Sequence, residues 1–104
     1  MKTTKTTPNN SNKPFKHCNE FAKVITDGRI YHFGRIQAKV ISQLYAASFT
    51  NSPWLFGKDI LYKAGSHTTR VSDLFKSQPN WRLLIESDRR GNYRLYYLDP
   101  PSIH

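Results

Sequence analysis

The chain has 104 residues, enough for one small domain, and no apolar run reaches the roughly 18 residues that a membrane-spanning helix needs. Sixteen lysines and arginines stand against seven aspartates and glutamates, so the net charge is +9 and polyanions such as nucleic acid are favoured partners. The single cysteine, Cys18, excludes an intrachain disulfide and a cysteine zinc cluster, and the lack of a secretory signal predicts a cytoplasmic setting.

Residues 1–19 are rich in Thr, Asn, Ser, Lys and Pro, and they contain four lysines without an acid. So few apolar side chains cannot bury enough surface to offset the entropy lost on ordering. We therefore expect a disordered basic tail. Such a tail is either an arm that follows DNA or simply a solvated end.

The next segment predicts a short N-terminal strand pair. Apolar side chains at Phe21, Val24 and Ile25 precede the run Thr26-Asp27-Gly28-Arg29, and further ones follow it at Tyr31 and Phe33. An Asp-Gly pair between apolar runs is a hairpin signal, because glycine tolerates positive φ.

Residues 35–49 have the apolar spacing of a helix that buries one face. The predicted inward face consists of Ile36, Val40, Ile41, Leu44, Tyr45 and Ser48. The predicted outward face consists of Gln37, Lys39, Ser42 and Gln43. Thr50-Asn51-Ser52-Pro53 predicts the end of this helix, and Trp54, Leu55 and Phe56 predict a short buried extended segment.

A second helix is predicted from about Lys58 to Lys63, with Ile60, Leu61 and Ala64 facing inward. Gly65 predicts its end, because the residue after a helix usually adopts left-handed geometry. After this tight turn, Ser66 is the predicted N-cap of a third helix. Its hydroxyl would accept a hydrogen bond from the backbone N–H of Thr68 or Thr69.

The third helix is predicted to run to about Lys76, with Val71, Leu74 and Phe75 facing inward. Its outward side chains are short or hydrogen-bonding, which suits base edges and phosphates. Together with Ser66 they form the predicted DNA-binding set of this helix: His67, Thr68, Thr69, Arg70, Ser72, Asp73 and Lys76. Asp73 would either accept from cytosine N4 or pair with a cation on the same helix.

A hairpin is predicted after Pro79-Asn80, because two alternating apolar runs flank the turn Asp88-Arg89-Arg90-Gly91-Asn92. The residues expected to face the core are Trp81, Leu83 and Leu95. Arg89 and Arg90 are expected at a flexible tip, where they reach phosphates or a narrow minor groove. The tyrosines predicted to pack or to bond phosphate are Tyr93, Tyr96 and Tyr97.

The order helix, turn, helix and hairpin between Gly57 and Leu98 resembles the winged helix-turn-helix family, and the resemblance covers about residues 20–98. RRGNYRLYYL is similar to the wing of response-regulator output domains. The predicted tight turn departs from the longer loop of those domains, and the chain contains no receiver domain. The resemblance implies an α+β fold with three helices, a short N-terminal strand pair and a C-terminal β-hairpin wing. Residues 1–19 would then be the tail, 20–98 the winged-helix domain and 99–104 a short C-terminal tail.

The resemblance also implies that the third helix enters the major groove of double-stranded DNA. The implied reading face is Thr68, Thr69, Arg70, Ser72 and Asp73, and the implied wing contacts are Arg89, Arg90 and Arg94. We expect a small transcriptional regulator or a mobile-element accessory factor. A winged-helix module that docks on proteins and an RNA-binding module are the alternatives, and both a homodimer and a partner protein are compatible with the sequence.

Motifs for other chemistry are missing from the sequence. The histidines, at positions 17, 32, 67 and 104, have no metal-ligand spacing, and no glycine-rich loop suits a phosphate. We therefore expect no enzyme activity, metal, cofactor, small-molecule substrate or membrane association.

Overall fold

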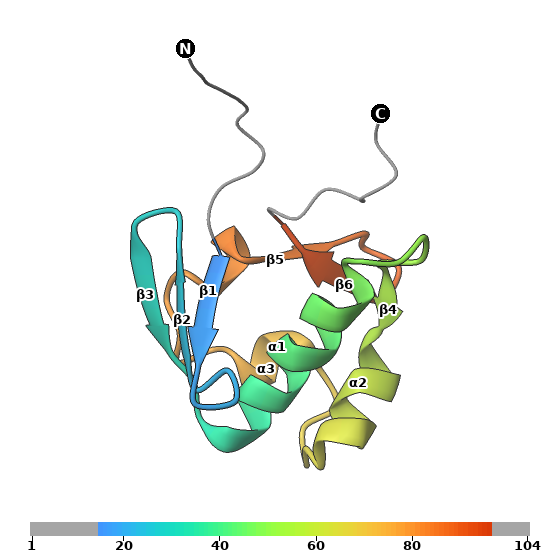
Figure 1. Ribbon diagram of the computed structural model, residues 1–104. Helices are drawn as coiled ribbons and strands as arrows, with labels where there is room; N and C mark the ends of the chain where they lie inside the picture. Colours follow the sequence, from blue (N-terminus) through green and yellow to red (C-terminus); the bar gives the residue numbers. More distant parts are fainter. Residues whose placement is uncertain (1–14, 97–104) are drawn as a thin grey trace.

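The computed structural model describes residues 15–96, in which three α-helices and two small antiparallel sheets form an α+β fold (Figure 1). The predicted fold class is confirmed at this level. Residues 1–14 of the predicted tail, Tyr97, and the predicted C-terminal tail 99–104 lie outside the described residues.

The first sheet contains β1 (Phe15–Cys18), β2 (Lys23–Thr26) and β3 (Arg29–His32) in that spatial order. The predicted hairpin is confirmed, since β2 pairs with β3 around Asp27 and Gly28, both of which have positive φ. The prediction that disorder extends to residue 19 is wrong, because β1 pairs with β2. The ring of Phe15 also stacks on Tyr45 at a centroid distance of 5.0 Å, a long-range contact that local composition does not reveal.

Helix α1 (Arg35–Ala47) follows the first sheet and buries Val40, Ile41 and Leu44, as its spacing predicts. Gln37, which was predicted to lie on the outward face, is buried instead. Its amide Nε2 donates to the backbone oxygen of Leu74 at 2.9 Å, and its Oε1 accepts from the Gly34 N–H at 3.0 Å. The polar side chain is accommodated because both ends are hydrogen-bonded.

The second sheet has the spatial order β4-β6-β5, with β4 at Leu55–Phe56, β5 at Ile85–Ser87 and β6 at Asn92–Leu95. The short strand before α2 (Gly57–Ala64) thus pairs with the C-terminal hairpin, as expected. Phe56 was predicted to be buried, but 45% of it is exposed. In this two-residue strand only one neighbouring strand covers the backbone, and the Phe56 ring remains at the surface.

The predicted strand does not begin at Trp81, because Trp81–Leu83 forms a 3-10 helix. Leu83 N–H donates to the oxygen of Asn80, and Leu84 N–H donates to that of Trp81, both at 3.0 Å. In a strand every second side chain faces the core, whereas in a 3-10 helix every third side chain does. Trp81 and Leu84 are therefore buried, whereas Leu83, which was predicted to face inward, is 41% exposed.

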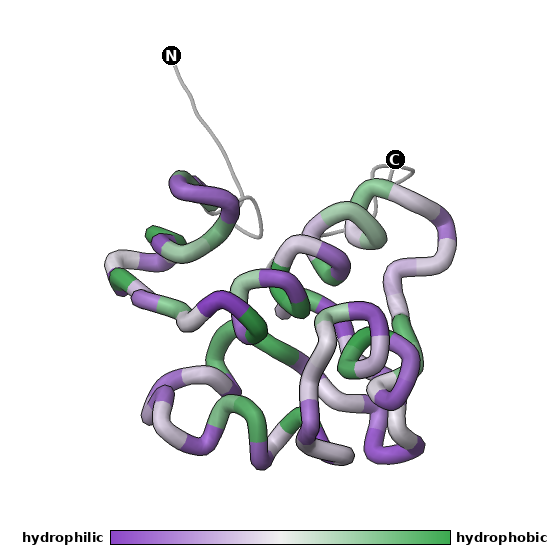
Figure 2. Tube along the Cα trace, turned by 90° about the horizontal axis from the view of Figure 1, so that it is seen from below, coloured by the Kyte–Doolittle hydropathy of each residue, from purple (hydrophilic) through white to green (hydrophobic). Residues whose placement is uncertain are grey.

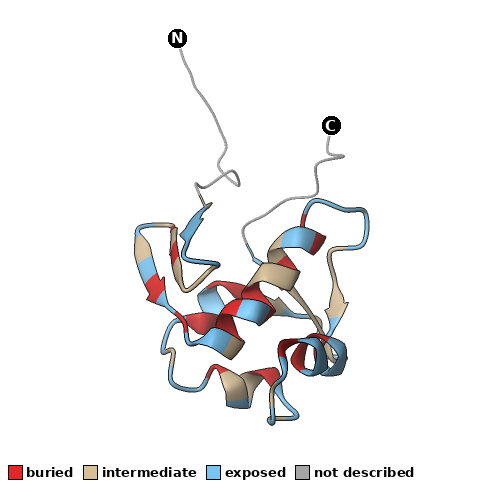
Figure 3. Ribbon diagram, turned by 60° about the horizontal axis from the view of Figure 1, so that its bottom comes forward, coloured by how far each residue is buried: buried red, intermediate tan, exposed pale blue. Residues whose placement is uncertain are grey.

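One hydrophobic core joins the helices to both sheets. Buried and exposed bands alternate along α1 and α2 (Figure 3), and short hydrophobic and hydrophilic stretches alternate along the trace (Figure 2). Phe75 has no exposed surface, and its ring contacts those of Phe33 and Trp81 at centroid distances of 5.7 and 5.9 Å. Within residues 15–96, every helix is too short or too polar to cross a membrane.

Candidate nucleic-acid interface

The end of α2 is closed by backbone hydrogen bonds. Gly65 has φ +79°, a left-handed conformation that favours glycine. Gly65 N–H donates to the oxygen of Tyr62, and Ser66 N–H donates to the oxygen of Leu61, both at 3.0 Å. The prediction that Gly65 ends the second helix is confirmed.

The chain after Gly65 is a non-helical link and not the first turn of a helix. The hydrogen bond predicted for Ser66 is present, since its Oγ accepts from the Thr68 N–H at 3.0 Å. The hydroxyl oxygens of Ser66 and Thr68 also lie 2.8 Å apart, within hydrogen-bond distance. A serine that bonds the backbone two residues later forms a local turn, and such turns compete with helix formation.

Helix α3 consequently covers only Val71–Leu74. The predictions of a tight turn at Gly65 and of a third helix that begins after Ser66 are both wrong, because residues 65–70 form a longer link between α2 and α3. Arg70 is extended, with φ −131° and ψ 139°, and its carbonyl accepts from the N–H groups of Asp73 and Leu74. The inward anchors are Val71 and Phe75, whereas Leu74 is only half-buried.

The predicted set is therefore spread over the link, α3 and the residue beyond it. On the link lie Ser66, His67, Thr68, Thr69 and Arg70; in α3 lie Ser72 and Asp73; and Lys76 follows α3. The exposed members are His67, Thr69, Arg70, Asp73 and Lys76, and the half-buried ones are Ser66, Thr68 and Ser72. The structure keeps these side chains at the surface, but it presents most of them from a link and not from a helix.

Two adjoining hollows connect the link to α2 and to the hairpin of β5 and β6, which we call the wing. The larger has a volume of about 670 Å³ and extends to Tyr62 and His67. The smaller has a volume of about 300 Å³ and extends to Gly91 and Tyr93 on the wing. The residues that line both are Lys58, Leu61, Thr69 and Arg70. We call the two hollows together the basic groove, because its shared charges are the cations Lys58 and Arg70.

The wing is held against the start of α2 by a close backbone approach. Gly57 N–H donates to the oxygen of Gly91 at 2.7 Å. A Cβ at position 57 would lie 2.8 Å from the ring atom Cε2 of Tyr93, so only glycine fits here without displacement of the ring. The position of the wing relative to the start of α2 is therefore set by packing.

The carboxylate of Asp88 accepts hydrogen bonds across the turn at the wing tip. Its Oδ1 accepts from the N–H groups of Arg90 and Asn92 at 2.7 and 3.0 Å, and its Oδ2 accepts from Asn92 Nδ2 at 2.8 Å. Hydrogen bonding, first of all by the Asn92 side chain, lowers the pKa of Asp88. The turn around Gly91, which we expected to be flexible, is closed by side-chain hydrogen bonds as well as by the strand ladder.

The three arginines predicted on the wing have different surroundings. Arg89 and Arg90 are exposed at the tip. Arg94 donates through Nε to Glu86 Oε1 at 2.9 Å, and its guanidinium lies 4.8 Å from the centre of the Trp54 ring. Arg94 is therefore engaged within the fold, and the exposed cations of the tip are Arg89 and Arg90.

Lys58 and Tyr62 belong to the candidate site but were absent from the predicted set. Both line the larger hollow, and Tyr62 is 85% exposed. Their spacing of four residues places them on one outward face of α2, a signal that was present in the sequence. The sequence does not show that this face and the link border the same hollow.

Within residues 15–96, no group of three or more His, Cys, Asp or Glu side chains is placed to hold a metal ion. Comparisons with protein-family models, curated proteins and solved structures found no match for this chain. The candidate site is accordingly defined by its geometry and charge.

Proposed function

We propose that this protein binds double-stranded DNA through the link at residues 65–70, the start of α3 and the wing tip. The observation on which this proposal depends is the basic groove, whose two adjoining hollows are lined by Arg70 of the link, Lys58 of α2 and, in the smaller one, Gly91 of the wing turn. Two further exposed guanidinium groups, those of Arg89 and Arg90, lie at the wing tip. Clustered cations on adjoining elements are the electrostatic footprint expected for phosphate contacts.

The order of the elements supports a winged helix-turn-helix. α1 is followed by β4, α2, α3 and the β5–β6 hairpin, and β4 pairs with the second strand of that hairpin. In such domains the third helix enters the major groove, and the wing reaches phosphates or the adjacent minor groove.

The shortness of α3 changes how base reading would occur. Its four residues span about 6 Å, too little to lie along several base pairs of a major groove. We infer that the link supplies most contacts, with Arg70 reaching the O6 and N7 atoms of a guanine and Thr69 contacting base edges or phosphate. Arg89 and Arg90 would neutralise phosphates. A small transcriptional regulator or a mobile-element accessory factor is the class of protein that this arrangement suits.

The proposal is tested by selection of bound sequences from a random duplex pool with the full chain. We expect enrichment of a short motif that includes guanine, and an affinity that falls steeply as the salt concentration rises. A Lys16→Ala and Lys23→Ala double variant, which loses two charges on the first sheet, should enrich the same motif. A lack of enrichment together with salt-independent binding would contradict DNA binding and favour a protein-docking module.

A further inference from the structure

Another hollow, which shares no lining residue with the basic groove, lies between the turn after β1 and the exposed side of α1. Its volume is about 680 Å³. Its lining combines apolar side chains with two cations one helical turn apart: Phe21, Ala22, Ala38, Arg35 and Lys39. A depression with this lining can accept an apolar side chain that is next to a negative charge.

A cluster of aromatic rings continues the hollow along β1 and α1. The members of the cluster are Phe15, His17, Phe21, Tyr45 and Phe49. His17 stacks on Phe21 at a centroid distance of 3.9 Å, and Phe49 meets Tyr45 edge-on at 4.9 Å. Phe49 nevertheless remains 56% exposed. Aromatic side chains that are grouped at a surface are typical of protein interfaces, whereas single exposed ones need no explanation.

The charges beside these rings are mostly positive. Arg35 and Lys39 are exposed, and neither forms an ion pair with another residue of the described range 15–96. Arg35 is the first residue of α1, and the first turn contains no acid that would offset the positive end of the helix dipole. Glu20 is the single acid in the lining of the hollow. The complementary partner is therefore negatively charged.

We propose that this surface, made of the hollow and the aromatic cluster and here called the β1–α1 face, docks an acidic peptide segment of a partner protein. An aromatic or long aliphatic side chain of the segment enters the hollow, and a neighbouring carboxylate pairs with Lys39 or Arg35. A second copy of this chain is a poorer occupant, because a symmetric contact would bring these cations together. Single-stranded nucleic acid is also disfavoured. Bases bind by stacking on free ring faces, whereas Phe15 stacks on Tyr45 and His17 stacks on Phe21.

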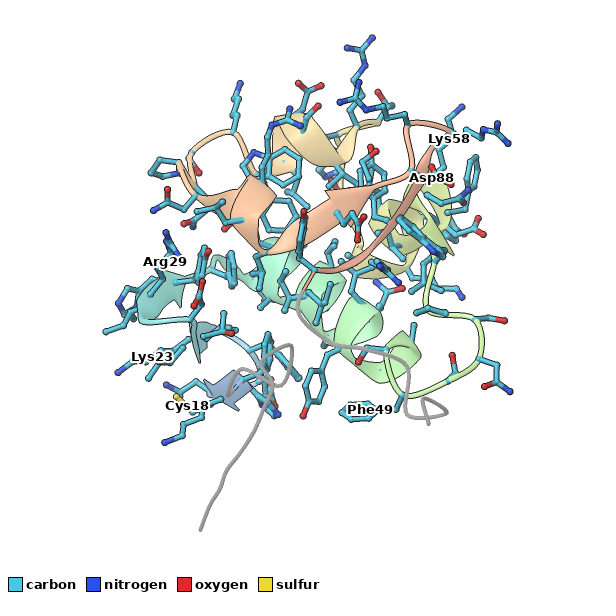
Figure 4. The ribbon with its side chains drawn as sticks, turned by 90° about the horizontal axis from the view of Figure 1, so that it is seen from above. Cys18, Lys23, Arg29, Phe49, Lys58 and Asp88 are labelled. Atoms are coloured by element: carbon cyan, nitrogen blue, oxygen red, sulfur yellow. The ribbon has the colours of Figure 1, made fainter. Side chains whose placement is uncertain are left out.

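The β1–α1 face is separate from the proposed DNA-binding surface. In Figure 4, Cys18 of β1 and Phe49 of the aromatic cluster lie on the opposite side of the view from Lys58 and Asp88. The hollow and the basic groove have no lining residue in common, so we expect a partner on the β1–α1 face to bind together with a duplex on the basic groove. The inference does not depend on DNA binding.

The experiment is a selection from a phage-displayed library of random dodecapeptides on the full chain, followed by fluorescence anisotropy with the enriched peptide made synthetically. We expect enrichment of Asp or Glu next to Phe, Trp or Leu. Lys39→Glu and Phe49→Ala should each weaken binding at least about tenfold, since the first reverses a cation of the hollow and the second removes the exposed ring of the aromatic cluster. Both side chains are at the surface, so the variants should fold, and circular dichroism melts verify this.

Three controls make the result decisive. The Arg89→Ala and Arg90→Ala double variant should bind the peptide as the parent does, and Lys39→Glu should keep its affinity for the selected duplex. A peptide in which the acidic residue is changed to Lys should bind the Lys39→Glu variant more tightly than it binds the parent protein. Enrichment without acidic residues, equal binding by all variants, or competition by the duplex would overturn the proposal. A labelled oligo(dT) that binds the parent but neither Lys39→Glu nor Phe49→Ala would assign the face to nucleic acid instead.

Discussion

Removal of the two wing-tip arginines gives the most quantitative test of how the wing acts. Arg89 and Arg90 are exposed, whereas Arg94 is engaged with Glu86 and Trp54. The tip can therefore supply two phosphate contacts. Each neutralised phosphate contributes about 0.9 to the slope of log affinity against log salt, so the double change to Ala should lower that slope by up to about 1.8.

This change in slope corresponds to a measurable difference in affinity. Between about 50 and about 200 mM salt, a change of about 1.8 in slope means that the parent loses about twelvefold more affinity than the double variant. Because phosphates carry no sequence information, the variant should bind a selected and a scrambled duplex with the same proportional loss. Anisotropy titrations of both duplexes across a salt series measure both effects.

The matched control is the double variant Lys16→Ala and Lys23→Ala, which loses the same charge from the first sheet. It should retain the slope of the parent apart from a small effect of net charge. An unchanged slope in the wing variant would refute phosphate contact by the tip. A loss confined to the selected duplex would show that the tip reads bases or groove width.

The remaining predictions concern the link, the core and the wing turn. Arg70→Ala should weaken binding to the preferred duplex by about 1–3 kcal/mol and relax specificity, and equal affinities for parent and variant on selected and scrambled sites would exclude base reading by this residue. In urea melts, Phe75→Ala should cost about 3–5 kcal/mol, whereas half-buried Leu74→Ala should cost under about 2 kcal/mol; the reverse order would contradict the packing of α3. Because hydrogen bonds lower the pKa of Asp88, the tip should stay ordered at neutral pH and loosen only as the pH falls below the usual Asp value of 3.8. Amide chemical shifts of Arg90 and Asn92 should report this transition, and Asp88→Asn should abolish it.

Features with a strong local signal could be predicted from the sequence. The Asp27-Gly28 turn, the buried face of α1 and the left-handed closure of α2 at Gly65 all depend on residues within one turn of one another. The exposed arginines at the wing tip follow from the glycine-containing turn in the same way. Local propensity decides such features because few long-range contacts compete with it.

Other parts of the candidate site depended on competition between local and distant interactions. The hydrogen bond from Thr68 to Ser66 could have begun a helix, but here it forms a turn, and α3 starts where Val71 and Phe75 enter the core. Outside the site, the 3-10 turn at Trp81 likewise buries Leu84 in the core in place of Leu83, which the alternating pattern had predicted.

The sequence by itself thus determined the α+β composition, the positive charge and the basic residues from which a nucleic-acid interface could be built. Only the tertiary structure decided that Lys58 and Arg70 line one groove, that Arg94 forms an ion pair with Glu86, and that β1 joins a sheet. The physical reason is distance along the chain. Helix and turn propensities act over a few residues, whereas grooves, ion pairs between strands and sheet edges form between segments that only the packed core brings together.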